Sequence, residues 1–296
     1  MSLQELANLI ERHARPDMTT PIDGVMIARH HTSVAEYEMS GSVMALIAEG
    51  RKQLALGDRI YEYGKGQYLV SSLDLPTSGQ FLDISAARPA LGLGLELDPA
   101  AIADLLLHAG PVVAGDGRGT PPSGMIVSDA PAELVDAAVR LLRLLDRPRD
   151  APVLAPLIKR EILWWLIVGD QSETVRQLGL ADSKLSQIGH AVRWIRENYA
   201  GSFRVEDVAE ICGMSVSALH RNFRAATAMS PIQFQKKIRL QEARLLLATH
   251  PRDVTGIGYR VGYDSASQFS REYRRQFGIA PSQDAIRLRE TGIGVY

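Results

Sequence analysis

The chain has 296 residues of ordinary globular composition, 46% hydrophobic and 23% charged, which gives two domains enough apolar side chains for separate cores. The net charge of −1 hides an asymmetry: from residue 184 onward 17 Lys and Arg stand against 10 Asp and Glu, whereas the preceding part has 16 against 24. This distribution favours phosphate binding by the basic C-terminal part and excludes DNA contact by the acidic N-terminal part.

Cys212 is the only cysteine, so an intrachain disulfide is excluded and we expect a cytoplasmic protein. Its place on the apolar face of an expected helix favours a small buried hydrophobe over a redox sensor. Residues 1–15 are charged throughout, unlike a signal peptide. The apolar run 162–168 is far shorter than the ~20 residues of a membrane span, so we expect no membrane association.

The N-terminal part, residues 1–170, is expected to be a β-rich domain with flanking helices. Residues 1–15 indicate an amphipathic helix with Leu3, Leu6, Leu9 and Ile10 in one stripe. From about 22 to 97, short β-prone segments alternate with glycines, which is typical of an antiparallel sandwich or barrel. The expected strands are 42–49, 52–56, 59–63, 67–72, 81–85 and, with a clean period of two, 91–97.

Three helices are expected after these strands, over about 99–109, 131–146 and 152–168, and the Gly- and Pro-rich stretch 111–130 is expected to be a loop. The last two helices are amphipathic and adjacent, which favours a helix-pair dimer interface; the alternative is that they only cover the sheet. The polar segment 171–183 is interpreted as the linker to the C-terminal domain, residues 184–296.

Tyr61, Tyr63 and Tyr68 are candidate ligand-binding residues, because aromatic walls with polar tips suit small molecules. The alternative, that they are ordinary strand residues packing on their neighbours, stays open. The adjacent pair His30 and His31 would point to opposite faces of a strand, and no spaced histidine and glutamate set accompanies it. We therefore expect no metal, no cofactor and no catalytic residue.

The segment 61–70, the Asp74-Leu75-Pro76 sequence and the stretch 91–99 resemble the N-terminal domain of one branch of AraC/XylS-type transcription regulators. The resemblance implies a cupin-like fold that binds a small effector or forms a dimer.

The C-terminal part contains one pattern twice, over 205–227 and 253–277: a short apolar-periodic helix, a glycine turn and a polar helix. Apolar or small residues recur with the spacing i, i+3, i+4 and i+7 at Val205, Val208, Ala209 and Cys212, and at Val254, Ile257, Gly258 and Val261. Gly213 and Gly262 follow as helix stops, and Ser215 and Ser265 as N-caps of the next helices. The pattern predicts two helix-turn-helix motifs, which indicates binding in DNA major grooves.

The second helix of each unit is expected to bury one aromatic face and expose a polar one that suits DNA. The buried residues are Leu219, Phe223, Phe269 and Tyr273. The exposed candidates are Ser217, His220, Arg221 and Arg224 in the first unit and Ala266, Ser267, Ser270, Arg271, Arg274 and Arg275 in the second. A long linker helix, about 231–248, begins at Ser230-Pro231, and its Lys236 and Lys237 are candidate phosphate contacts.

Residues 184–290 resemble the DNA-binding domain of AraC/XylS-type regulators, through Gly262-Tyr263, the run 267–271 and the segment 277–281. The resemblance assigns base-edge contacts to Ser217, His220, Arg221, Ala266, Ser267, Ser270 and Arg271. Two residues depart from the family pattern. Gly258 replaces a usual alanine, at about 1 kcal/mol of helix propensity, and Ala228 replaces a usual glycine, which predicts a less regular helix end.

The fold class expected is therefore α+β: a cupin-like sandwich or barrel followed by an all-α domain with two helix-turn-helix units. The function expected is a sequence-specific regulator, by family habit an activator that would meet RNA polymerase. It would bind double-stranded DNA in two adjacent major grooves, sense a small molecule and form a homodimer. The alternative is a cupin-like metal-dependent enzyme with a helical appendage, which lacks a visible set of ligands.

Overall fold

The computed structural model describes residues 2–109, 121–169 and 172–291, and the chain forms two compact units. One comprises residues 1–189 with 221–228, and the other comprises residues 190–220 with 229–296. No helix within the described residues is long and apolar enough to cross a membrane.

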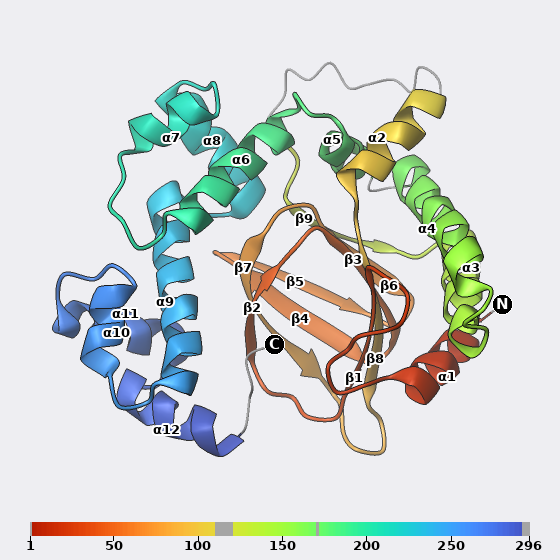
Figure 1. Cartoon of the computed structure of the whole chain (residues 1–296), viewed down its shortest axis with the longest axis horizontal. Coiled ribbons are helices and arrows are strands. Elements are labelled where there is room, and N and C mark those ends of the chain that lie inside the picture. The colour runs from red at the N-terminus through yellow and green to blue at the C-terminus, as the bar shows by residue number, and fades with distance from the viewer. Residues whose placement is uncertain (1, 110–120, 170–171, 292–296) are drawn as a thin grey trace. The chain divides into compact units, whose positions relative to one another are not determined.

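Two antiparallel sheets form the centre of the N-terminal part (Figure 1). The first sheet has the strand order β1 (Val25–His30), β8 (Ala90–Glu96), β3 (Val43–Glu49), β6 (Gln67–Ser71), β9 (Met125–Asp129). The second sheet has the order β2 (Glu36–Ser40), β7 (Leu75–Leu82), β4 (Arg51–Leu56), β5 (Arg59–Gly64). The expected antiparallel sandwich is confirmed.

Helices cover one face of the first sheet (Figure 1). They are α1 (Leu3–His13), α3 (Ala132–Arg143), which continues as a 3-10 turn η1 (Leu144–Asp146), and α4 (Ala151–Val168). The period-two pattern of β8 explains this layer: Leu91, Leu93 and Leu95 join the core with the helices, while Gly92 and Gly94 point to the other face. The apolar stripe of α1 is buried in the same core at Leu6, Leu9 and Ile10.

Two expectations for this part were wrong, and two strands were missed. The strand expected at 81–85 runs over Leu75–Leu82, because Pro76 lies near its start, where a missing N–H is tolerated, rather than in a turn. The loop expected at 111–130 contains strand β9, whose short apolar sequence is hidden between Gly- and Pro-rich flanks; residues 110–120 lie outside the described residues. Strands β1 and β2 were not expected at all.

The segment 171–183, expected to be a polar linker, contains helix α5 (Ser172–Gly179). This helix packs against α2 (Pro99–His108), and its Val175 is fully buried in the core of the N-terminal part. The N-cap expected for α2 is confirmed, since the Asp98 carboxylate accepts the Ala100 N–H at 2.9 Å.

The C-terminal part is entirely helical within the described residues. Its helices are α6 (Lys184–Glu197), α7 (Val205–Ile211), α8 (Val216–Thr227), α9 (Pro231–Thr249), α10 (Val254–Arg260), α11 (Ala266–Phe277) and α12 (Pro281–Thr291). Helix α9 begins as expected at Ser230, which forms a capping box with Gln233. Its inner residues, such as Ala243 and Leu247, share a core with Ile257, Phe269 and Tyr273.

Candidate DNA-binding surface

The first helix-turn-helix unit is α7, a turn and α8. Two nested hydrogen bonds close the C-terminus of helix α7. The Gly213 N–H donates to Glu210 O at 3.0 Å, and the Met214 N–H donates to Ala209 O at 2.9 Å. This Schellman pattern needs a residue with positive φ, and Gly213 has φ +64°. The expected glycine stop is confirmed.

The second unit, α10 and α11, turns in the same way. The Gly262 N–H donates to Tyr259 O and the Tyr263 N–H to Gly258 O, both at 3.0 Å. Gly262 has φ +94°, and a Cβ there would lie 2.2 Å from Ala200 O and 2.8 Å from the Arg239 guanidinium. Conformation and space therefore both demand glycine at this turn.

A close helix crossing explains Gly258. A Cβ on Gly258 would lie 3.0 Å from a ring atom of Phe269, which is fully buried in α11. The small residue expected where two helices cross is thus confirmed in the second unit. The propensity cost of glycine, about 1 kcal/mol, is offset by the approach that it permits.

We call α8 and α11 the reading helices. Both begin as the sequence predicts, whereas the C-terminal end of α8 differs from the prediction. Ser215 accepts the Ala218 N–H at 3.3 Å and Ser265 accepts the Gln268 N–H at 3.4 Å, so both N-caps are confirmed. Ala228 has φ +58° and donates its N–H to Arg224 O at 2.9 Å. The less regular end expected there was wrong: Ala228 adopts the left-handed conformation and carries the penalty as strain of about 1 kcal/mol.

Both reading helices bury an aromatic face and expose a polar stripe. Phe223, Phe269 and Tyr273 are fully buried, as expected. On α8 the exposed side chains with the spacing i, i+3, i+4 and i+7 are Ser217, His220, Arg221 and Arg224. On α11 the same spacing is shared by Ser267, Ser270, Arg271 and Arg274, all exposed except Ser270, which is half-buried; Ala266 and Arg275 flank them.

Glu272 of α11 anchors the reading helix to its neighbours. Its carboxylate accepts hydrogen bonds from Lys236 Nζ at 3.0 Å, Tyr263 OH at 3.0 Å and Gln268 Nε2 at 3.2 Å. Burial raises the pKa of Glu272, but these hydrogen bonds outweigh burial and hold the pKa below its ordinary value. The carboxylate therefore stays ionised and keeps its three donors.

Lys236 and Lys237 occupy positions less open than the sequence suggested. Lys236 is paired with Glu272 in the structure, and Lys237 is half-buried, which lowers its pKa. Phosphate contact by Lys236 would require breaking that pair. Both residues remain candidates, but Arg274 and Arg275 are exposed and better placed to meet phosphate first. Arg224 is also exposed, and its guanidinium lies 3.8 Å from the exposed carboxylate of Asp58.

Arg239 of α9 is a positioning residue that sequence reasoning missed. Its guanidinium donates to Tyr199 O at 2.7 Å, Gly262 O at 2.6 Å and Gly201 O at 2.9 Å. One side chain therefore fixes the turn of the second unit to the segment after α6. An arginine on a half-polar helix face gives no sequence signal for such a role.

Asp284 of α12 is the second residue that was missed. It is fully buried, 2.8 Å from Arg244 Nε of α9, and accepts the Tyr273 hydroxyl of α11 at 2.8 Å. Burial and the neighbouring Asp284 charge raise the pKa of Tyr273, so its hydroxyl stays protonated as the donor. This triad ties three helices together beneath the polar stripe of α11.

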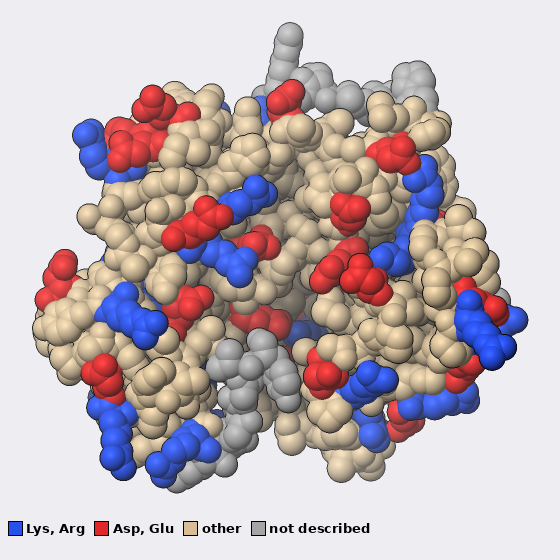
Figure 2. Space-filling model, viewed as in Figure 1, with Lys and Arg blue, Asp and Glu red and all other residues tan. Residues whose placement is uncertain are grey.

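Cys212 is 4% exposed, and burial raises the pKa of its thiol, which agrees with a small buried hydrophobe. Figure 2 shows Lys and Arg interleaved with Asp and Glu on the face in view, so the positive excess of the C-terminal part is not gathered there.

The three tyrosines named as candidate ligand-binding residues are not brought together. Tyr68 is buried in the core beneath the helices, on one face of the first sheet. Tyr61 and Tyr63 lie on the inward face of β5 in the second sheet, where Tyr63 is 2% exposed and the Tyr61 hydroxyl is 3.0 Å from Ser123 Oγ. Within the described residues, no three of His, Cys, Asp and Glu are grouped to hold a metal ion.

Two family models match the chain. Residues 21–174 match the N-terminus of AraC-type transcriptional regulators, and residues 208–285 match a helix-turn-helix domain. Together they cover both parts of the molecule.

Curated relatives include the HTH-type transcriptional activators RhaS of Salmonella schwarzengrund and Salmonella arizonae, 32% and 31% identical over 162 residues. Each match covers 54% of this chain and 56% of the relative, so the chain spans about half the length of these relatives.

Solved structures of ToxT from Vibrio cholerae have a similar fold. A structure at 1.65 Å resolution has a TM-score of 0.54 and 12% identity, and covers 88% of this chain and 97% of its own. A structure bound to an unsaturated fatty acid has a TM-score of 0.53 and 12% identity, and covers 94% of this chain and 100% of its own. At such identity the likeness concerns the fold alone.

Proposed function

We propose that this chain, which belongs to the family of AraC-type transcriptional regulators, binds specific DNA sequences with α8 and α11 in two adjacent major grooves. The observation that carries the proposal is the repeated stripe of exposed polar side chains, which has the same spacing on both reading helices. Helix α9, 19 residues and about 28 Å long, is of a length that suits a spacer between two reading units about 34 Å apart.

Within each stripe we assign two roles. Base edges would be read by Ser217, His220 and Arg221 of α8 and by Ala266, Ser267, Ser270 and Arg271 of α11, while Arg224, Arg274 and Arg275 would bind phosphate. Arginine donates two parallel hydrogen bonds to guanine, and small polar residues let a helix sit deep in the groove.

The proposal also covers activation of transcription, contact with RNA polymerase and the sensing of a small molecule. RhaS is named an activator, and we propose activation here too, with RNA polymerase as the protein contacted at the promoter. We place this action in the cytoplasm, and we propose that the N-terminal part senses a small molecule, as a ToxT structure with a bound fatty acid illustrates for that protein.

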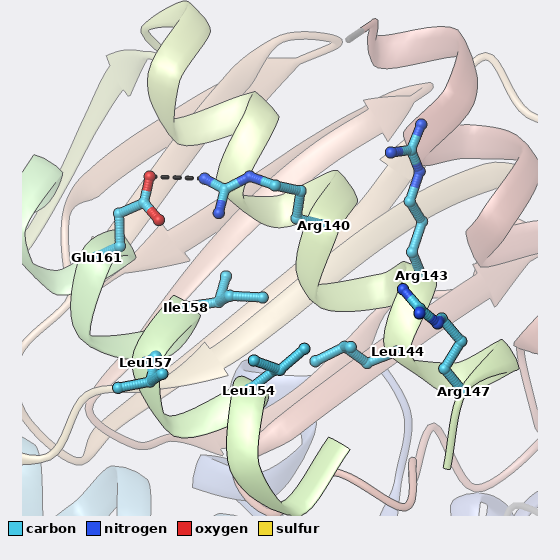
Figure 3. Close-up of a pocket in the computed structure, with 8 residues that line it drawn as sticks. All are labelled: Arg140, Arg143, Leu144, Arg147, Leu154, Leu157, Ile158 and Glu161. Atoms are coloured by element: carbon cyan, nitrogen blue, oxygen red, sulfur yellow. Dashed lines mark hydrogen bonds and ion pairs between the residues drawn. The ribbon is translucent and has the colours of Figure 1, made fainter. Parts of the chain in front are cut away.

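We also propose a homodimer formed through α3 and α4. The start of α4 exposes Val153, Leu154 and Leu157, which are 68%, 38% and 61% exposed. Beside them a hollow of about 470 Å³ opens between α3 and α4, with Leu144 and Ile158 in its lining and Arg143 and Arg147 on one wall (Figure 3). Contiguous exposed apolar residues of this kind mark an interface.

The test of the dimer is the sedimentation coefficient of the purified protein. Leu157→Glu should convert dimer to monomer, whereas Pro152→Ala, at an exposed residue on the same helix, should not. A monomeric parent protein would contradict this part of the proposal.

The test of DNA recognition is selection of genomic fragments by the purified protein, followed by affinity measurements at several salt concentrations. We expect one enriched sequence with two half-sites, and an affinity that falls by roughly one power of the salt concentration per phosphate contact. An affinity independent of sequence would contradict it.

A further inference from the structure

The compact unit that contains the two sheets also contains the C-terminal half of reading helix α8, residues 221–228. Gly57 and Asp58 form the turn between strands β4 and β5, and Arg59 follows as the first residue of β5. All three residues approach this half of α8. Arg59 and its partner Ala225 are 166 positions apart in the chain, so the contact is no part of the local helix end.

The N-terminal part supplies hydrogen-bond donors to the C-terminal end of α8. The last carbonyl groups of a helix have no partners within the helix. Arg59 Nη1 donates to Ala225 O at 3.1 Å and also to Ser123 Oγ at 3.1 Å. The Gly124 N–H donates to Ala226 O at 2.9 Å. Two carbonyl groups of the last turn are therefore satisfied from outside the helix, and this attaches the helix end to the sheets.

Gly57 brings the β4–β5 turn into direct contact with the last residue of this half-helix. Gly57 has φ +62°, and a Cβ there would lie 2.6 Å from Ala228 O and 3.0 Å from Ala228 Cβ. Conformation and space both demand glycine at this position. Because Gly57 touches Ala228 and Arg59 bonds to Ala225, the residue between them, Asp58, is held beside α8.

Asp58 places a carboxylate next to the polar stripe of α8. Its Oδ2 atom lies 3.8 Å from Arg224 Nη2. Arg224 is the last member of the exposed stripe that begins at Ser217, and it is the member proposed to bind phosphate. The side chains of Arg224 and Asp58 are 73% and 68% exposed, so the ion pair is weak and an approaching anion can displace the carboxylate.

The carboxylate of Asp58 has the same sign of charge as a DNA phosphate. DNA that approaches α8 meets this carboxylate where Arg224 is to meet phosphate, and Arg224 must exchange one anion for another. The surrounding charges do not compensate, because the chain before residue 184 has 24 Asp and Glu against 16 Lys and Arg. The turn therefore opposes DNA binding by electrostatic repulsion and by competition for Arg224.

We propose that the β4–β5 turn is an autoinhibitory contact, in which the Asp58 carboxylate occupies the place of a DNA phosphate on Arg224. The contact lowers the DNA affinity of the first helix-turn-helix unit. Any change in the N-terminal part that moves this turn away from α8 raises that affinity without altering a reading residue. The inference rests on the proposed function, because it concerns the binding of DNA by α8.

The competing explanation is that the turn only caps α8. The bonds from Arg59 and Gly124 go to backbone carbonyl groups and stabilise the helix end whatever the charge of residue 58. Under that explanation the carboxylate of Asp58 has no effect on the binding of DNA. A substitution that removes the charge and keeps the turn distinguishes the two explanations.

Asp58→Asn in the full chain is this substitution, since asparagine suits turns as well as aspartate does. Fluorescence anisotropy measures the affinity for DNA fragments that the parent protein selects. Asp58→Asn should bind them about fivefold more tightly, a change of about 1 kcal/mol. Asp83→Asn is the matched control and should leave the affinity unchanged. Asp83 is 76% exposed and pairs with Arg51 at the other end of β4, roughly 20 Å from the turn.

A double-mutant comparison ties the effect to Arg224. Arg224→Ala should weaken binding more in the Asp58→Asn protein than in the parent, because only there is the guanidinium free to bind phosphate. Arg274→Ala, at the matching place on α11, should have the same effect in both backgrounds. Asp58→Ser also removes the charge, and it should reproduce the result of Asp58→Asn if the amide group plays no part.

Three outcomes would overturn the autoinhibitory contact and leave capping as the role of the turn. They are unchanged or weaker DNA binding by Asp58→Asn, an equal effect of Arg224→Ala in both backgrounds, and tighter binding by only one of the two charge-removing variants. A parent protein that selects no DNA sequence overturns the proposed function instead. The comparison of Asp58→Asn with the parent can then still be made on any duplex, because phosphate contacts carry no sequence information.

Discussion

The two helix-turn-helix units turn alike but are secured differently at their ends. Both use a Schellman turn with a glycine of positive φ. Helix α7 begins after Arg204, which makes no side-chain cap, whereas α10 begins after Asp253, whose carboxylate accepts the Gly256 N–H at 3.0 Å. Helix α8 ends at Ala228 with φ +58°, whereas α11 ends at Gly278 with φ +76°.

This difference shows that the two units share the geometry of the turn, whereas the residues that stabilise their helix ends differ. Both reading helices end at a residue with positive φ. This residue is alanine in the first unit and glycine in the second, so only the first unit has the steric strain of a Cβ in the left-handed conformation. Four predictions sharpen or break this comparison.

The largest effect is expected from Asp284→Asn, beneath the second unit. It leaves Arg244 partly buried without its charge partner, which should cost about 3–5 kcal/mol of unfolding free energy. Urea denaturation measures this loss, with the exposed Gln283→Asn as control. A loss below about 0.5 kcal/mol, the range of ordinary surface changes, would show that the triad does not secure α11.

Arg271→Ala should weaken binding to the selected DNA by about 1–3 kcal/mol and relax specificity at one base pair. Arg221→Ala should do the same in the other half-site, because the two arginines hold matching places in the two stripes. Fluorescence anisotropy with single-base variants of the site measures both. Arg289→Ala, at an exposed arginine of α12, is the control. Unchanged selectivity in both reading-helix variants would refute the assignment of roles.

Ala228→Gly should stabilise the protein by up to about 1 kcal/mol, since glycine adopts positive φ without the steric penalty of a Cβ. Gly278→Ala should destabilise it by a similar amount for the opposite reason. Thermal denaturation of the pair checks the sign; equal shifts in one direction would contradict strain at Ala228.

The smallest effect is expected from Arg204→Asp, which supplies the missing N-cap of α7. A gain of about 0.5 kcal/mol is expected, because the carboxylate can accept an orphan N–H while Glu206 and Asp207 already crowd the first turn with negative charge. Denaturation with Arg204→Ala as reference measures it. No gain over alanine would mean that water already satisfies the helix start.

The turns, caps and buried aromatic faces of the reading helices followed from the sequence because they depend on neighbours within a few residues. Gly213, Ser265 and Phe269 each have a local signature of type and spacing. Residues such as Arg239 and Asp284 hold these elements together through contacts with groups about 40 positions away in the chain. No local sequence pattern predicts such contacts.

The sheet was harder to predict for a related reason. A strand such as β9 is five residues long and gains its stability from pairing with β6, about 58 positions earlier in the chain. Pairing of this kind also places Tyr68 beneath the helices on the first sheet and Tyr63 on β5 of the second sheet, which sequence spacing alone did not reveal.

Hydroxyl-radical footprinting on the selected DNA tests the central claim most directly. Two protected patches should lie on one face of the duplex with centres about 10–10.5 base pairs apart. Arg221→Ala should weaken one patch and Arg271→Ala the other. A single patch, or loss of the same patch in both variants, would contradict recognition by two reading helices in adjacent major grooves.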